Sequence, residues 1–113
     1  MPEPLLAQRL RRLPVATVLG REVRVALGPC ARFLGLAHLN REEVGAGLLI
    51  PHCSSVHTLG MRLPLDLYFL GEYGEVVTVR REVGPRHLAF CARARAVLEV
   101  PAGEGGENLA ATS

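Results

Sequence analysis

Alternation of apolar and polar residues is the most regular feature of the chain. Residues 15–27 contain two runs. In residues 22–27, Val and Leu alternate with Glu, Arg and Ala, and Gly20 separates this run from the apolar run at residues 15–19. Alternation with a period of two is typical of strands with one buried face, so this region predicts a β-hairpin. The apolar run at residues 66–70, the glycine-containing turn at 72–75 and the run at 76–83 predict a second hairpin.

Two short helical segments are predicted between the hairpins. Pro29 follows Gly28 and suits the first position of a helix, because its missing N–H would have no partner there. Apolar residues at helical spacing follow it at Phe33, Leu36 and Leu39. Asn40 with Glu43 three residues later resembles a capping box, which predicts a second helical turn.

The remaining pattern predicts more strands. Leu48–Ile50 is expected to be a buried strand, residues 84–91 an irregular connection, and Ala94–Val100 a final strand that Pro101 ends. Short strands joined by Gly and Pro turns, with one or two brief helices, predict a mainly β domain, close to α+β. The expected architecture is an antiparallel β-sandwich or partly closed barrel of jelly-roll character.

A chain of 113 residues is expected to form one domain with a substantial core. We predict an N-terminal arm or short helix at residues 1–14, a single β domain at 15–103, and a flexible tail at 104–113. The tail is rich in Gly, Glu, Asn and Ala and carries little apolar surface to pack.

Composition narrows the class of protein. All 13 basic residues are Arg, but Glu is interspersed almost one for one, so nucleic-acid binding is not predicted. The first residues lack the apolar stretch of a signal peptide, and the longest uncharged run, residues 44–61, contains Pro51 and two His. These features predict a soluble cytoplasmic protein with no membrane partner, whose three Cys stay reduced.

Polar side chains are concentrated between Val56 and Asp66. His57, Thr58 and Arg62 lie there with Asp66, the only Asp of the chain, which sits between two Leu residues in a predicted buried strand. A buried carboxylate needs a partner, and Arg62 or His57 is the nearby choice. Two interpretations remain open, a structural contact that fixes the bend at Pro64 and a ligand-binding polar site.

Cysteine and histidine spacing suggests further alternatives. Cys53-x3-His57 and His87-x3-Cys91 together supply four ligand types that zinc accepts, although no Cys-x2-Cys knuckle is present. Cys53 and Cys91 could instead form a disulfide, or remain unlinked thiols. A nucleophilic Cys53 activated by His57 is also open. No cofactor is predicted.

Separated motifs resemble the family called domain of unknown function 192. They occur in the family's order at Leu34–Leu36, Ala46–Ile50, Leu63–Leu70, Gly74–Val77 and Ala96–Gly103. The resemblance covers roughly residues 16–103 and implies a mainly β fold of sandwich or jelly-roll character, with no established reaction. Many members carry Lys-Asn where this chain has Leu59-Gly60, so only Pro64 and Asp66 of that motif carry over.

The function predicted from these residues is a small β domain that binds an unknown small molecule or protein partner. Its site would be a pocket beside the Val56–Asp66 segment, with His57, Thr58, Arg62 and Asp66 as the polar groups. One alternative is a hydrolase or transferase that uses Cys53 or His57. Another, implied only by exported relatives in the family, is an accessory role in secretion or surface assembly.

Overall fold

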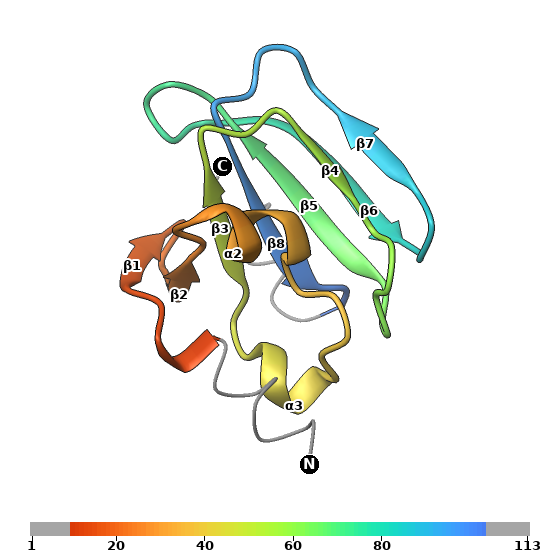
Figure 1. The fold of residues 1–113 in the computed structure, drawn as a ribbon. Helices are drawn as coiled ribbons and strands as arrows, with labels where there is room; N and C mark the ends of the chain where they lie inside the picture. Colours follow the sequence, from red (N-terminus) through yellow and green to blue (C-terminus); the bar gives the residue numbers. More distant parts are fainter. Residues whose placement is uncertain (1–9, 104–113) are drawn as a thin grey trace.

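A computed structural model describes residues 10–103 of the chain, and these residues form a mainly β fold (Figure 1). The predicted tail, residues 104–113, and residues 1–9 of the predicted N-terminal arm lie outside the described residues. A helical turn at Leu10 and Arg11 leads into the first strand. The strands are β1 (Val15–Val18), β2 (Arg21–Val25), β3 (Leu48–Pro51), β4 (Ser55–His57), β5 (Leu65–Leu70), β6 (Val76–Val83), β7 (Leu88–Phe90) and β8 (Ala96–Pro101).

The strands form two sheets that are consistent with a sandwich. A six-stranded sheet has the order β1-β2-β3-β8-β5-β6, and a two-stranded sheet contains β4 and β7. Every neighbouring pair is antiparallel except β2 and β3, which are parallel. A parallel pair needs a crossover connection, which the segment carrying both helices supplies. The mainly β prediction is therefore confirmed, and the described strands do not close into a barrel.

Both predicted hairpins are present. In the first, β1 pairs antiparallel with β2 through the turn at Gly20, and Val15 lies opposite Arg24. In the second, β5 pairs with β6, and two register shifts interrupt the ladder. The segment predicted as an irregular connection contains β7, a strand of only three residues that sequence alone did not reveal.

The two helices are shorter than the apolar spacing suggested. Helix α2 (Pro29–Leu34) begins at the expected proline and ends at Gly35, whose φ of 53° and ψ of −126° favour glycine. The predicted helical stripe is therefore wrong, because Phe33 is exposed while Leu36 and Leu39, which are buried, lie beyond the helix. Helix α3 (Arg41–Val44) begins with the predicted capping box, confirmed by reciprocal bonds between Asn40 and Glu43.

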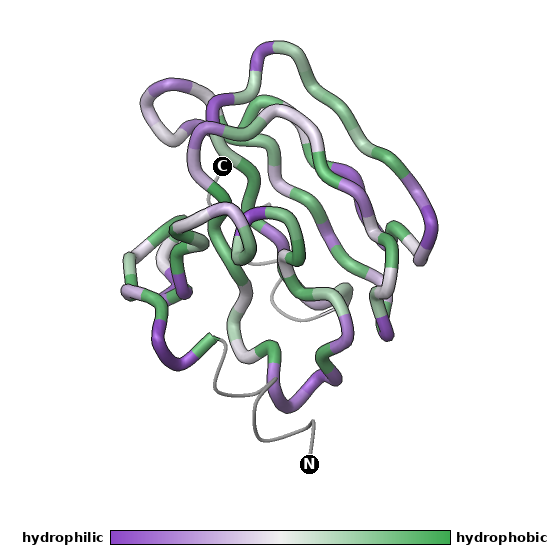
Figure 2. Tube along the Cα trace, viewed as in Figure 1, coloured by the Kyte–Doolittle hydropathy of each residue, from purple (hydrophilic) through white to green (hydrophobic). Residues whose placement is uncertain are grey.

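Apolar residues cover both faces of the large sheet. The side chains of Leu67 and Phe69 belong to the main cluster, which includes Val56 of β4 and Ala89 of β7. The small sheet therefore packs against this face. The opposite face carries a second cluster that includes Tyr68, Leu70 and Leu98. Figure 2 shows hydrophilic residues gathered mainly in the connecting loops and along β6.

Successive residues of a strand point to opposite faces of a sheet, which separates the two buried carboxyl groups. Where β5 pairs with β8, Asp66 lies beside Val100 and Leu67 lies beside Glu99. The Glu99 side chain thus lies on the face that the small sheet and α2 cover, and Asp66 lies on the other face. No helix among residues 10–103 is long and apolar enough to cross a membrane.

Candidate functional site

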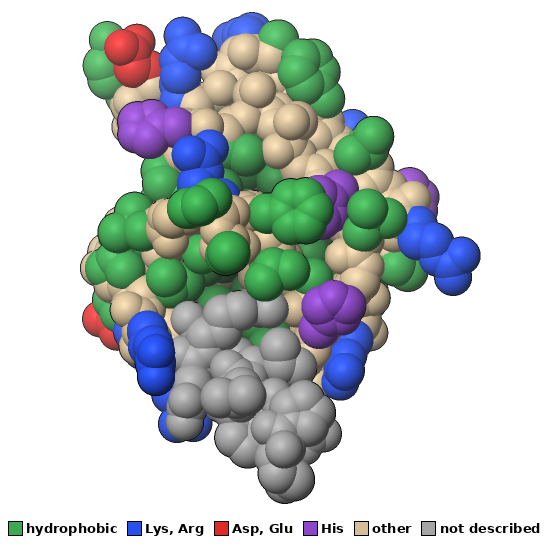
Figure 3. Space-filling view, viewed as in Figure 1, with side chains coloured by type: hydrophobic (Ala, Val, Ile, Leu, Met, Phe, Trp, Pro, Cys, Tyr) green, Lys and Arg blue, Asp and Glu red, His purple; other side chains and the backbone are tan. Residues whose placement is uncertain are grey.

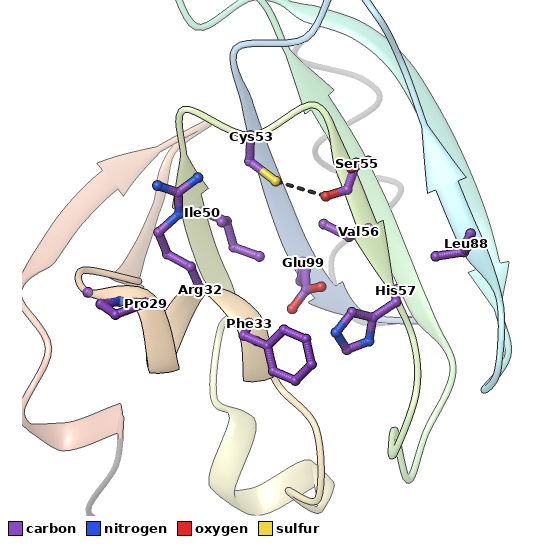
Figure 4. A pocket seen from close by; sticks show the side chains of 12 residues that line it. Pro29, Arg32, Phe33, Ile50, Cys53, Ser55, Val56, His57, Leu88 and Glu99 are labelled. Carbon is purple, nitrogen blue, oxygen red and sulfur yellow. Dashed lines mark hydrogen bonds between the residues drawn. The ribbon is translucent and has the colours of Figure 1, made fainter.

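A cavity of about 600 Å³ opens between α2, the large sheet and β4 (Figure 4). It adjoins the start of the segment in which sequence predicted a pocket, because both Val56 and His57 line it. The lining residues are Gly28, Pro29, Arg32, Phe33, Gly35, Ile50, Cys53, Ser55, Val56, His57, Leu88 and Glu99. We call this cavity the Glu99 pocket.

Glu99 of β8 supplies the carboxyl group of the pocket. Its side chain is buried to 1% exposure, and its Oε1 accepts a hydrogen bond from the Leu36 backbone N–H at 3.2 Å. Burial disfavours the charged form and raises the pKa of Glu99 from 4.5 to about 8, although the Leu36 hydrogen bond lowers the pKa in part. At neutral pH this group is therefore mainly a protonated acid, which can both donate and accept a hydrogen bond.

Gly35 makes room for this carboxyl group. A Cβ atom at position 35 would lie 2.7 Å from Glu99 Oε1, closer than side chains normally approach. The backbone there also has a positive φ that side chains rarely adopt. The glycine that ends α2 thus lets the next amide, that of Leu36, reach the buried acid.

His57 of β4 places an imidazole in the same cavity. Its Nδ1 accepts a hydrogen bond from the Leu59 backbone N–H at 3.3 Å, so the ring proton is on Nε2. Nε2 is buried, and within residues 10–103 no group forms a hydrogen bond with it. The ring centroid lies 4.9 Å from that of Phe33 at an interplanar angle of 57°. Figure 4 shows the imidazole and the Glu99 carboxyl group directed into the same space.

Arg32 and Cys53 lie on another side of the pocket. The Arg32 guanidinium donates a hydrogen bond to the His52 carbonyl oxygen at 2.8 Å. Arg32 is the one Arg among the lining residues. The Cys53 thiol donates to the Ser55 carbonyl oxygen at 3.0 Å. A cation therefore lies beside a cavity whose one carboxyl group is largely protonated.

Exposed apolar side chains lie around the opening of the pocket. Phe33 is 68% exposed and Leu88 is 82% exposed, and both also line the cavity. Phe90, on the same face of β7 as Leu88, is 66% exposed. Figure 3 shows hydrophobic side chains grouped on this face of the molecule. The pocket thus has an apolar opening and polar groups within.

Asp66 does not lie in the pocket, and its predicted partners were wrong. Its Oδ1 accepts a hydrogen bond from the Glu82 backbone N–H at 2.8 Å, and its Oδ2 lies 3.6 Å from Arg81 Nη1. Both contacts come from β6, the neighbouring strand, rather than from Arg62 or His57. The carboxylate therefore ties β5 to β6 on the face of the sheet opposite the pocket.

Thr58 and Arg62 are also absent from the pocket lining. Thr58 is fully buried, and its hydroxyl donates to the Gly84 carbonyl oxygen at 2.7 Å and accepts from the His87 N–H at 2.8 Å. It thus joins the end of β4 to the loop between β6 and β7. Arg62 is exposed. Of the four predicted polar residues, the structure places only His57 in the cavity.

The chemistry proposed for Cys and His does not assemble in the described residues. No three His, Cys, Asp or Glu side chains of residues 10–103 are close enough to hold a metal ion. The Nδ1 atom of His87 lies 2.8 Å from the Pro85 carbonyl oxygen, which occupies that side of the ring. Cys53 and Cys91 are free thiols, so the alternative disulfide is not formed.

Glu99 is the residue that the sequence reading missed. It stands in the predicted strand Ala94–Val100, which the structure shows as β8 (Ala96–Pro101), and its neighbours in β8 are apolar. An acid inside a continuous apolar run is a signal of a buried carboxyl group, because an exposed face would have brought other polar residues at alternate positions. That signal was available without the structure.

The chain is similar to one described protein family and to solved structures of two bacterial proteins. The sequence model of a protein family described as "Uncharacterized ACR" matches residues 14–108. A solved protein from Sinorhizobium meliloti 1021, described as a "putative transcription regulator", is 23% identical over 83% of this chain and 81% of its own, with a TM-score of 0.68. A protein of unknown function from Novosphingobium aromaticivorans DSM 12444 is 23% identical over 85% of this chain and 75% of its own, with a TM-score of 0.63. At this identity the two structures support the fold alone. No curated protein matches the chain.

Proposed function

The chain belongs to the domain of unknown function 192 (DUF192) family, whose description names no activity, and on that premise we propose a small-ligand-binding domain. The binding site is the Glu99 pocket. The ligand is a small organic molecule with an apolar body and a polar end that accepts a hydrogen bond from His57.

The observation that carries this proposal is the buried Nε2–H of His57. An unpaired buried donor costs about 1–3 kcal/mol of folding free energy, so such groups are rare in folded proteins. This donor is unpaired within the described residues, and the residue that carries it lines the cavity. A ligand acceptor in the cavity removes that cost.

The shape and lining of the cavity agree with a small ligand. Its volume of about 600 Å³ falls within the usual range for ligand pockets, roughly 300–1,000 Å³. Phe33, Ile50 and Leu88 supply apolar contact surface, while His57 and Glu99 supply the few polar groups that orient a ligand. Sites of this kind combine many apolar contacts with a small number of placed hydrogen bonds.

The alternative of a nucleophilic Cys53 receives no such support. An activated thiol needs a base within hydrogen-bond reach. The hydrogen bond that the Cys53 thiol makes is instead to the Ser55 carbonyl oxygen. The imidazole accepts at Nδ1 from Leu59, and its remaining nitrogen is a donor rather than a base. Binding is therefore the better-supported role for His57.

A fragment screen followed by NMR tests the proposal. Two backbone amides report on the pocket, since the Leu36 N–H bonds to Glu99 and the Leu59 N–H bonds to His57. We expect fragments that bind to shift both amide resonances. Ser55→Trp, which places a large ring in the cavity, should remove these shifts. Thr78→Trp is the matched control, because Thr78 is an exposed strand residue outside the pocket lining.

Two results contradict the proposal. One is a screen in which bound fragments shift resonances elsewhere and leave Leu36 and Leu59 unchanged. The other is binding that Ser55→Trp and Thr78→Trp reduce equally, since this would separate binding from the cavity.

A further inference from the structure

We infer that the Glu99 pocket is selective for organic anions, namely small carboxylates attached to an aromatic or aliphatic body. This inference rests on the proposed function and adds the charge class of the ligand. It follows from the kinds of polar group in the cavity and from their hydrogen bonds.

The first argument is that the polar groups inside the cavity are donors. His57 offers Nε2–H, because its Nδ1 already accepts from Leu59. Glu99 accepts the Leu36 N–H at Oε1, and in its protonated form it offers an O–H. Two donors directed into one space suit a ligand group with two acceptor oxygens. A carboxylate has that geometry and forms stronger hydrogen bonds than a neutral acceptor.

The second argument is the charge balance of the lining. Arg32 is a cation at the cavity, and its side-chain hydrogen bond is to a neutral carbonyl oxygen, that of His52. The one acidic residue among the lining residues is Glu99, which burial keeps mainly protonated at neutral pH. A bound anion therefore meets no full negative charge in a cavity bordered by the exposed Arg32 cation, whereas a bound cation would face the His57 donor.

The third argument concerns the body of the ligand. Phe33 presents a ring beside His57, and Ile50 and Leu88 supply aliphatic surface. A flat aromatic body can pack against this surface while its carboxylate reaches the donors. The surface around the opening is also apolar, so the pocket favours amphipathic anions over strongly hydrated inorganic ones.

The inference makes binding depend on the protonation of Glu99. The other titratable or charged side chains that line the cavity are Arg32 from α2, Cys53 from the β3–β4 loop and His57 from β4. When Glu99 loses its proton, the cavity loses a donor and gains a negative charge that repels a carboxylate. Since the pKa of Glu99 is about 8, affinity for an anion should fall about tenfold between pH 7 and pH 9.

Three flat probes of matched shape test the inference by calorimetry or NMR titration: benzoate, benzamide and benzamidine. They are anionic, neutral and cationic, respectively. We expect benzoate to bind at least about tenfold more tightly than benzamide at pH 7, and benzamidine to bind most weakly. Benzoate affinity should fall about tenfold by pH 9, while benzamide affinity should change little.

Variants assign the effect to particular residues. Glu99→Gln keeps a neutral hydrogen-bonding group and should remove the pH dependence of benzoate binding. Cys53→Ser, which changes another lining side chain and leaves Glu99 intact, is the control and should retain the dependence. Arg32→Gln should weaken benzoate about tenfold and leave benzamide unchanged, and it remains informative if Glu99→Gln does not fold. Arg80→Ala is its matched control, because Arg80 is exposed and outside the lining.

The inference is overturned if benzamide or benzamidine binds as tightly as benzoate, or if benzoate affinity is the same at pH 7 and pH 9. It is also overturned if benzoate does not bind. In each case the amide resonances of Leu36 and Leu59 test the proposed function separately. If fragments that are not anions shift these resonances, the pocket is still a ligand site, but one that selects another charge class.

Discussion

Replacing Glu99 by Gln should make the stability of the domain much less dependent on pH. The buried acid of the parent has a pKa of about 8 against an ordinary value of 4.5. Between these two pH values the folded protein holds a proton that the unfolded chain has released. Stability must therefore fall as the pH rises. The contribution is fully present below pH 4.5 and is lost as the pH passes through about 8.

The size of the effect follows from the pKa change. At about 1.4 kcal/mol for each pKa unit, the change from 4.5 to about 8 corresponds to about 5 kcal/mol. Because the group is fully buried, solvent screening does not reduce this value as it would at the surface. Domains of this size are typically stable by about 5–15 kcal/mol, so ionisation of Glu99 at high pH should remove a large share of the stability of the parent. Glutamine cannot ionise and keeps an oxygen that accepts from Leu36.

Urea denaturation followed by far-ultraviolet circular dichroism at pH 5, 7 and 9 measures the effect. The informative quantity is the difference in unfolding free energy between Glu99→Gln and the parent, because all other titrating groups are common to both. We expect this difference to move in favour of the variant by several kcal/mol between pH 5 and pH 9. Glu72→Gln, in the exposed turn between β5 and β6, should show no such change. An unchanged difference for Glu99→Gln would refute the account of a buried neutral acid.

Four further predictions concern residues that hold the fold together. Gly35→Ala should destabilise the protein by about 1–3 kcal/mol more than Gly45→Ala in thermal unfolding, because both positions have positive φ but only Gly35 faces Glu99; equal losses would argue against the close approach. Asp66→Ala should cost about 1–3 kcal/mol by leaving the Glu82 N–H without its acceptor. A double-mutant cycle should give Asp66 and Arg81 a coupling of no more than about 1 kcal/mol, since the Arg81 side chain is 42% exposed, and should give Asp66 and Arg62 none. Asn40→Ala should cost about 1 kcal/mol in urea denaturation through loss of the capping box, and a negligible change would mean that the cap contributes little.

Local chemistry explains why much of the fold could be predicted from the sequence. Gly20 and the 72–75 turn mark the two hairpins, Pro29 marks the start of α2, and Asn40 with Glu43 marks the start of α3. Each signal depends on residues near one another in the chain. The same reasoning placed His57 near a pocket, because β4 adjoins a loop rich in polar residues.

The remainder depended on contacts between distant parts of the chain. Asp66 was assigned to neighbours in sequence, yet its partners come from β6 through strand pairing. The need for a residue without a side chain at Gly35 follows from the approach of Glu99, 64 positions later, which no helical periodicity encodes. The cavity combines residues of α2, β3, β4, β7 and β8, and the strand register alone decides that Glu99 and not Asp66 faces it.

The most direct test of a ligand site is a histidine-ring ¹H–¹⁵N spectrum, recorded without and with the tightest-binding fragment of the screen. In the free protein, the structure predicts a His57 ring protonated at Nε2, with Nδ1 accepting from Leu59. Saturation with the fragment should shift the Nε2–H resonance to the position of a hydrogen-bonded donor. A ring protonated at Nδ1, or a His57 resonance that stays unchanged when the fragment is saturating, would contradict the account.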